Sequence, residues 1–358
     1  MASVVDWSVA ERVATRISGT DPFAGSYLAD SLHTDFDELT TQAQSLVESY
    51  TGWRSDSGAA RAKVADRSDW IAGNIASFQR MLRPLTDRFE EKLASGVLAP
   101  VAGRIAGAEM GAVLGWMSTR VLGQYDMLVL DDEPTDDQDL VYYVGPNILA
   151  MEKRFGFPPR EFRLWIALHE ITHRTQFTGV PWLRPYFLTQ VNEMLGTVDA
   201  DPAQFFRALG RIAESLRTRT SLLSEGGIVT LFADDAQRQT MDRLGGLMSL
   251  LEGHGDVTMD RAGGDLIPSA ERFGRVLRAR RQNQGGPSRF LQKLIGLEAK
   301  LAQYEQGERF IETVEEVGGT EYLERAFESP DLLPTLVEIR EPAKWMARVP
   351  RHALAAGS

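Results

Sequence analysis

The chain contains no cysteine among its 358 residues. This absence excludes disulfide bonds, thiolate zinc sites and cysteine nucleophiles. Histidine is scarce as well, with five residues in the whole chain. Any zinc-like ion would therefore have to be bound by imidazole and carboxylate groups, and few imidazoles are available.

Long apolar runs and an excess of positive charge are also absent. The most apolar stretch, residues 110–119, is bracketed by Glu109 and Arg120 and is too short to span a bilayer. The N-terminal residues lack the basic and apolar segments that mark a signal peptide, so we expect a cytoplasmic protein. A net charge of −11 argues against nucleic acid or an anionic membrane as the main partner.

Helical periodicity dominates the chain. The expected helices cover residues 27–50, 60–95, 102–117, 184–196, 202–219 and 235–260. Two stretches, 124–130 and 140–145, have strand character instead and flank an acidic loop. We interpret them as a hairpin just before a helix that starts after Pro158 and Pro159 and ends at Gly179. The sequence therefore predicts a mainly α fold with one small β element.

Glycine recurs once per turn in one predicted helix, at positions 103, 107, 111 and 115. Such a stripe of small residues is typical of close helix–helix packing. No repeat or long linker divides the chain, so we expect one functional unit over residues 1–358. It can be divided into an N-terminal lobe with the hairpin, 1–180, and a helical lobe, 181–358.

The stretch ALHEITHRTQF, residues 167–177, contains two of the five histidines. On a helix, His169 and His173 stand on the same face and can direct imidazole nitrogens at one point. They would supply two ligands of a tetrahedral zinc site. Glu170 would lie beside the ion, where it can take a proton from the attacking water and pass it to a leaving amine. This is the H-E-x-x-H pattern of zincin metallopeptidases.

The alternative is an ordinary exposed helix whose two histidines bind nothing. The surrounding sequence disfavours it, because Phe162, Trp165 and Leu168 give the helix apolar side chains for burial. One departure from the zincin pattern is Arg174, where many zincins have an uncharged residue; it could face solvent or a carboxylate. We therefore predict a metal-binding helix.

A zinc site of this kind needs a third protein ligand and one open position. No histidine follows His173 at the H-x-x-G-x-x-H spacing, so we expect a carboxylate from a second helix, and Glu252 in LMSLLEGHGDVTMD is the strongest candidate. His254 lies about 200° around a regular helix from Glu252, so both cannot easily bind one ion. It could be the ligand itself, or contact substrate if the helix is broken at its flanking glycines. Glu193 and Asp199 stay open as further alternatives.

The pair Glu252 and Asp256, four residues apart, resembles the second ligand helix of thermolysin-like gluzincins. In those proteins an aspartate four residues after the glutamate ligand holds a ligating histidine by its other ring nitrogen. The resemblance implies Glu252 as a zinc ligand and Asp256 as the residue that orients a histidine. The distance in sequence from His173 to Glu252 exceeds that of compact gluzincins, so we expect an inserted subdomain beside the cleft.

Five stretches over residues 4–350 together resemble an actinobacterial family of zincin-like hydrolases. They are VDWSVAERVATRISG, YYVGPNILAMEKRFGFP, LHEITHRTQFTGVPWL, MSLLEGHGDVTMD and RRQNQGGPSRFLQKLIGLEAKLAQYEQGERFI. The branch that the chain resembles most is labelled as associated with biosynthesis of coenzyme F-420, which implies a shared genomic neighbourhood. The family implies a mostly α zincin-like fold, with the metal on His169 and His173 and catalysis on Glu170.

The predicted function is that of a zinc-dependent hydrolase, specifically a metallopeptidase that cleaves a peptide or amide bond. A predicted edge strand within residues 140–147 could pair with an extended peptide substrate. The alternative is a non-catalytic zincin-like interaction protein associated with the coenzyme F-420 pathway. The candidates to stabilise the oxyanion are Tyr125, Tyr142, Tyr143, Tyr186 and His254.

Overall fold

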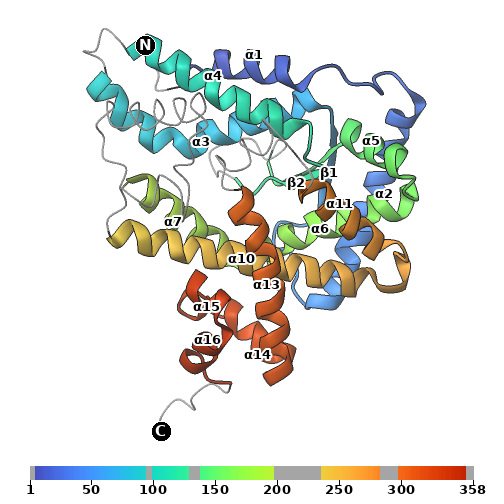
Figure 1. Ribbon diagram of the computed structural model, residues 1–358, viewed down its shortest axis with the longest axis vertical. Coiled ribbons are helices and arrows are strands. Elements are labelled where there is room, and N and C mark those ends of the chain that lie inside the picture. The colour runs from blue at the N-terminus through green and yellow to red at the C-terminus, as the bar shows by residue number, and fades with distance from the viewer. Residues whose placement is uncertain (1–4, 94–98, 129–137, 197–234, 283–296, 352–358) are drawn as a thin grey trace.

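The protein, seen in a computed structural model, consists mainly of long helices around a small sheet (Figure 1). The structure describes residues 5–93, 99–128, 138–196, 235–282 and 297–351. The helices are α1 (Trp7–Ser18), α2 (Tyr27–Thr51), α3 (Arg67–Leu93), α4 (Ala99–Ser118), α5 (Gly145–Phe155), α6 (Pro159–Gly179), α7 (Leu183–Gly196), α10 (Asp235–Gly263), α11 (Ala270–Gln282), α13 (Leu297–Gly318), α14 (Thr320–Glu324), α15 (Leu336–Arg340) and α16 (Pro342–Arg348). The strands are β1 (Arg61–Ala65), β2 (Gly123–Tyr125) and β3 (Leu140–Val144). The predicted mainly α fold with a small β element is confirmed.

The sheet has the strand order β1-β3-β2. β3 pairs antiparallel with β2, with Gly123 opposite Tyr143, as the predicted hairpin requires. It also pairs in parallel with β1, a strand that sequence periodicity assigned to a helix beginning at residue 60. That assignment was wrong: α3 begins at Arg67. A five-residue strand is too short to show a clear period, and its pairing partner lies far along the chain.

The prediction that residues 140–147 contain an edge strand was also wrong. β3 lies between β1 and β2, so both of its edges are already paired. All five residues of β3 are buried, which explains its continuous apolar run, LVYYV. Any pairing of this sheet with a peptide would therefore have to use another strand.

The glycine stripe of α4 packs against α1, as its spacing predicts. A Cβ atom built on Gly107, Gly111 or Gly115 would lie 2.2, 2.3 or 2.5 Å from a backbone oxygen of α1 or of its N-cap residue. Only residues without a side chain allow the two backbones to approach this closely. In Figure 1 the two helices lie side by side at the end of the molecule opposite α14–α16.

Helix α6 runs through the interior, with α2 and α10 packed against it and β2 passing beside it (Figure 1). It begins with Pro159 at its first position, where the missing N–H costs no hydrogen bond. Most of its residues are buried, including polar ones such as Thr172 and Gln176. The histidines of α6 therefore stand among packed helices rather than on an exposed face.

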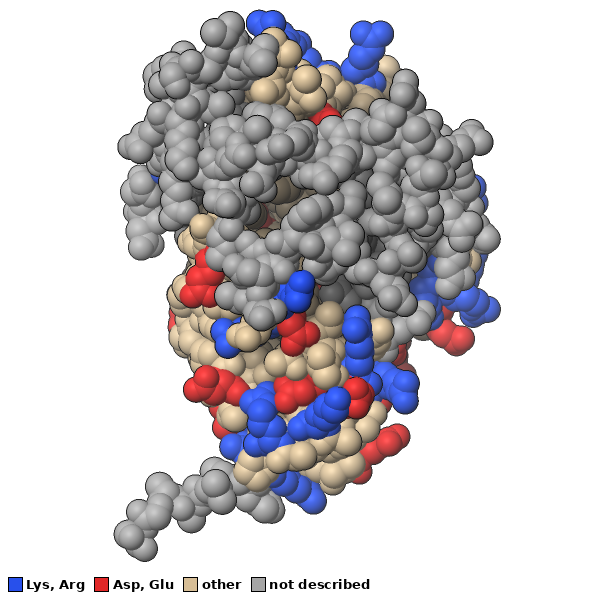
Figure 2. All heavy atoms as spheres, turned by 60° about the vertical axis from the view of Figure 1, so that its left-hand side comes forward, with Lys and Arg blue, Asp and Glu red and all other residues tan. Residues whose placement is uncertain are grey.

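The surface carries charges of both signs. On the face shown in Figure 2, they intermix over the C-terminal helices and form no extended patch of one sign. Ion pairs there join Arg348 to Glu338 at 2.7 Å and Lys344 to Glu341 at 2.9 Å. Within the described residues, no helix is both long and apolar enough to traverse a membrane. The helix predicted over 202–219 lies outside the described residues.

Candidate metal centre

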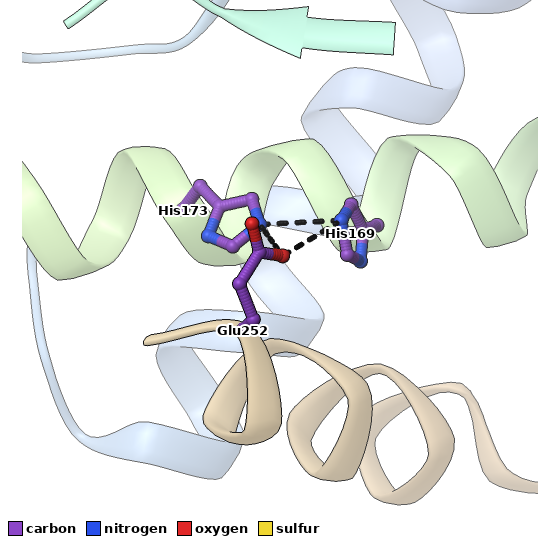
Figure 3. Close-up of side chains that lie close together, drawn as sticks. All are labelled: His169, His173 and Glu252. Atoms are coloured by element: carbon purple, nitrogen blue, oxygen red, sulfur yellow. Dashed lines mark hydrogen bonds and ion pairs between the residues drawn. The ribbon is translucent and has the colours of Figure 1, made fainter. Parts of the chain in front are cut away.

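Two helices bring three potential ligand atoms together (Figure 3). His169 and His173 come from α6, and their Nε2 atoms lie 3.2 Å apart. Glu252 comes from α10; its Oε2 atom lies 3.4 Å from Nε2 of His173 and 3.9 Å from Nε2 of His169. In the described part of the chain, this is the group of histidine and acidic side chains arranged to hold a metal ion.

Two of the three distances, 3.2 and 3.4 Å, fit a zinc ion, and the third, at 3.9 Å, is about half an ångström longer. Zinc bonds of about 2.0–2.1 Å in a tetrahedral site separate neighbouring ligand atoms by about 3.3–3.4 Å. The Glu252 carboxylate is buried and its Oε2 atom faces both imidazole nitrogens. A buried carboxylate is costly unless positive charge lies beside it, and a bound cation would supply that charge. The donor set, two imidazoles and one carboxylate, is also one that zinc prefers.

Glycines place α10 close enough to deliver Glu252. A Cβ atom on Gly253 would lie 2.4 Å from the carbonyl carbon of Gly307, so α10 and α13 cross with their backbones in contact. On the opposite side, a Cβ atom on Gly255 would lie 3.3 Å from Cε1 of His173. These glycines do not break the helix, because α10 is continuous from Asp235 to Gly263. They instead allow α10 to pack closely against α13 on one side and against the histidines of α6 on the other.

Glu170 lies beside the three ligand atoms and not among them. Its Oε2 atom accepts a hydrogen bond from the backbone N–H of Tyr125 on β2, at 3.1 Å. A Cβ atom on Gly123 would lie 2.7 Å from the Oε1 atom of Glu170. Glycine at this position therefore allows the backbone of β2 to pack directly against the carboxylate. Burial raises the pKa of Glu170 to about 7; Glu252 adds to the rise, while His173 and the Tyr125 N–H oppose it.

The metal-free site binds a proton strongly at His173. Burial lowers the pKa of this imidazole, but the Glu252 and Glu170 carboxylates outweigh burial and raise it to about 9. The site therefore attracts positive charge at the point where the three ligand atoms meet. An ion that binds there must displace this proton.

On α10, Asp256 lies one helical turn after Glu252 and His254 lies two residues after it, and the two side chains have different surroundings. Asp256 points its Oδ1 atom at Nδ1 of His169 from 3.8 Å. His254 is buried, and its Nδ1 atom lies 3.0 Å from Nε2 of Gln176. Burial lowers the pKa of His254 to about 3, and the positive charges of neighbouring groups add to this effect. His254 therefore faces the helix interface, away from the three ligand atoms.

Glu193, one of the acids named as alternative ligands, does not join the group of three. Glu193 is exposed on α7, where it accepts a hydrogen bond from Gln190 at 3.0 Å. Asp199 lies outside the described residues. Residues 197–234, within the segment expected to form an inserted subdomain between His173 and Glu252, are outside them as well.

The tyrosines named as oxyanion candidates differ in where their hydroxyl groups point. The hydroxyl of Tyr143 bonds a threonine of α2 in the core, and that of Tyr142 lies against α3. The hydroxyl of Tyr125 donates to Asp139 at 2.8 Å, and the same carboxylate pairs with the buried Arg174 at 2.7 Å. Arg174 thus faces a carboxylate. Tyr186, half-buried on α7, remains a candidate.

Sequence reasoning missed three contributors to the site: Gly123, the backbone of Tyr125, and Gln176. The amide of Gln176 lies 3.0 Å from Nδ1 of His173. Its position three residues after His173, on the same helical face, was a signal that could have indicated it. The two β2 residues carried no such signal, because only the fold brings that strand to α6.

The fold and the site together define a mainly α protein with an H-E-x-x-H helix and a buried carboxylate brought beside it by a second helix. The chain belongs to the zincin-like metallopeptidase family, whose sequence profile matches residues 5–346. A solved structure from Chloroflexus aurantiacus, described as "a putative hydrolase with a novel fold", is similar over 98% of this chain and 100% of that chain, with 29% sequence identity and a TM-score of 0.69. No curated protein matches the chain.

Proposed function

We propose that this protein is a zinc-dependent hydrolase that cleaves a peptide or amide bond, with Glu170 as the general base. The observation that carries the proposal is the convergence of His169, His173 and Glu252 at zinc-like distances with the Glu170 carboxylate held beside them. A zinc-binding scaffold protein would need the three ligands but would have no use for Glu170, a second acid positioned beside them. Family membership supports the same chemistry.

Glu170 is suited to moving protons near neutral pH. Its pKa of about 7 lets the carboxylate accept a proton from the attacking water and return it to the leaving amine. The Tyr125 N–H holds one carboxylate oxygen, and in the proposed mechanism the Glu170 carboxylate would take the proton of the attacking water. When bound, zinc would supply Lewis-acid chemistry, polarising the substrate carbonyl and lowering the pKa of water.

The ligands have separate tasks in this mechanism. His169 and His173 provide neutral nitrogen donors, and Glu252 provides the negative charge that partly balances a divalent cation. Because Glu252 is buried, its charge acts with little screening by solvent. With zinc bound, these three residues would leave one position open for water or substrate.

The decisive test compares the wild type with Glu170→Gln. Zinc content is measured on purified protein, and cleavage is measured on peptide and simple amide libraries. We expect both proteins to bind one zinc ion, and Glu170→Gln to lose about 10²–10⁴-fold in kcat. His169→Ala serves as the control that should lose zinc and activity together.

The opposite result is equally clear. A wild type that holds zinc but cleaves no peptide or amide would overturn the proposed hydrolase. It would favour the non-catalytic alternative, an interaction protein associated with the coenzyme F-420 pathway. Equal cleavage by the wild type and Glu170→Gln would remove Glu170 from the mechanism.

A further inference from the structure

The amide of Gln176 joins the two helices that carry the candidate metal ligands. Gln176 lies on α6, three residues after His173, and its side chain is fully buried. Its Oε1 atom lies 3.0 Å from Nδ1 of His173. Its Nε2 atom lies 2.9 Å from the backbone oxygen of Leu251 and 3.0 Å from Nδ1 of His254, both on α10. One side chain thus contacts a predicted ligand and the neighbour of another.

The carbonyl of Leu251 determines which way the amide points. A carbonyl oxygen can only accept a hydrogen bond, so the group facing it must be the NH₂ of Gln176. The oxygen of the amide must then face Nδ1 of His173. The orientation follows from the partners themselves, because the reversed amide would place two acceptors against each other.

This orientation determines the hydrogen positions on His173. The Oε1 atom of Gln176 can only accept, so Nδ1 of His173 must carry hydrogen and donate. A neutral imidazole with hydrogen on Nδ1 has its lone pair on Nε2. That Nε2 atom is the one that faces His169 and Glu252, while the other ring nitrogen points away from them (Figure 3).

We propose that Gln176 is a positioning residue that locks His173 in the tautomer able to bind metal through Nε2, with His254 as the anchor of the amide. The proposal rests on the proposed metal centre and deepens it, since it assigns a role to a residue outside the three ligands. It also assigns His254 a structural role, as the hydrogen-bond partner of Gln176, in place of the substrate contact that the sequence left open. Histidine ligands in metal sites commonly need such a partner on their second nitrogen.

His254 is itself held firmly. Its ring stacks on Trp53 with centroids 5.1 Å apart and meets the edge of Phe327 at 5.2 Å. Its Nδ1 atom accepts from the second N–H of the Gln176 amide, and the hydroxyl of Thr258 lies 3.4 Å away. The amide is therefore fixed at two points on α10, the Leu251 carbonyl and the His254 ring. Neither point requires a charge.

An amide suits this position better than a carboxylate would. Glu170 and Glu252 already place two acids at the site, and a third buried charge would have to be compensated. A carboxylate would also present an oxygen to the Leu251 carbonyl. Glutamine supplies an acceptor for His173 and donors for α10 within one neutral group.

The test measures zinc affinity by chelator competition at one fixed pH on Gln176→Met, which keeps the length and volume of the side chain but removes its hydrogen bonds. We expect zinc binding to weaken about 10–100-fold. The matched control is Gln190→Met, at a buried glutamine of α7 that bonds only Glu193 in the described structure, and it should bind zinc as the wild type does. Thermal unfolding of the metal-free variants checks that each is folded.

A second variant separates hydrogen bonding from packing. Gln176→Glu keeps an acceptor for His173, so it should recover part of the zinc affinity that Gln176→Met loses. A residue with only a packing role would show the reverse order, because a buried carboxylate disturbs the core more than methionine does. His254→Phe keeps the stacking but removes the anchor, and should weaken zinc binding less than Gln176→Met does.

Nitrogen NMR of ¹⁵N-histidine-labelled, zinc-loaded protein gives the direct readout. We expect zinc on Nε2 and hydrogen on Nδ1 of His173. Zinc on Nδ1, or a Gln176→Met variant with the affinity of the wild type, would overturn the proposal. Zinc binding without any cleavage would overturn the proposed hydrolase and leave this test intact, whereas a wild type that binds no zinc overturns both.

Discussion

The two histidines of the proposed metal centre have different partners at their Nδ1 atoms. On one side, His173 donates to a neutral amide at 3.0 Å, and that amide is fully buried. On the other, His169 faces the Asp256 carboxylate at 3.8 Å, and the Asp256 side chain is 31% exposed. The buried side relies on short hydrogen bonds of fixed geometry, and the exposed side relies on a charge that water can screen. We therefore expect Gln176 to fix the orientation of the His173 ring, and Asp256 to have a smaller effect on how strongly His169 binds the ion.

The largest effect is expected at Glu252, which the two sides share. Glu252→Gln keeps the shape of the side chain but removes the charge that faces both imidazoles. Zinc affinity should fall by more than about 100-fold, the upper range for a residue that only supports a ligand. Chelator competition measures the loss, and Glu193→Gln on the surface of α7 is the control. An affinity within tenfold of the wild type would remove Glu252 from the ligand set.

Gly123→Ala is expected to change catalysis and leave metal binding intact. The new Cβ would lie 2.6 Å from Cγ of Glu170 and must push the carboxylate aside. A displacement of about 1 Å in a catalytic group can cost about 100-fold in kcat. Steady-state kinetics and zinc content are measured together. Gly274→Ala, where a Cβ would meet only the flexible end of Arg278, is the control. Unchanged kcat in Gly123→Ala would show that β2 does not position the base.

The pH dependence of zinc binding tests the buried side. Zinc binds neutral imidazole, and the pKa of His173 in the metal-free protein is raised to about 9 by the carboxylates near it. Below that pH the proton must leave before the ion can bind. Affinity should therefore rise with pH, by about tenfold per unit between about pH 7 and pH 9. Affinity that does not change over this range would mean that His173 is neutral without metal.

The smallest effect is expected on the exposed side, with Asp256→Asn. The amide keeps an acceptor near Nδ1 of His169, and the lost charge is partly screened by water. Zinc affinity should fall less than about tenfold, and less than in Gln176→Met. High salt should narrow the difference from the wild type. A larger loss in Asp256→Asn than in Gln176→Met would reverse the ranking of the two sides.

Local spacing explains why part of the site could be predicted. His169, Glu170 and His173 are arranged by one helical turn, so the sequence of α6 placed them correctly relative to one another. The close packing of α1 and α4 was predictable for the same reason, since the glycine period is a property of one helix. In both cases the relevant geometry lies within a single regular element.

Long-range pairing explains the errors. Whether β3 is an edge or a central strand depends on β1. Of the two strands that pair with β3, β1 is the more distant in sequence, and its residues were assigned to a helix. The Tyr125 N–H reaches Glu170 because β2 lies beside α6, and no local sequence pattern predicts that contact. Glu252 was predicted as the strongest carboxylate candidate on a second helix, with support from a resemblance, but its approach to the histidines depends on glycine contacts between α10 and α13.

The amino-acid sequence alone determined the kind of chemistry available: without cysteine, two imidazoles one turn apart and an acid beside them leave histidine and carboxylate as the donors for zinc. The tertiary structure decided which carboxylate meets those imidazoles, which strand holds Glu170, and which way the amide of Gln176 points. The physical reason is that helical spacing is a property of consecutive residues, whereas ligand distances and hydrogen-bond directions between helices are set by the packing of segments far apart in the chain.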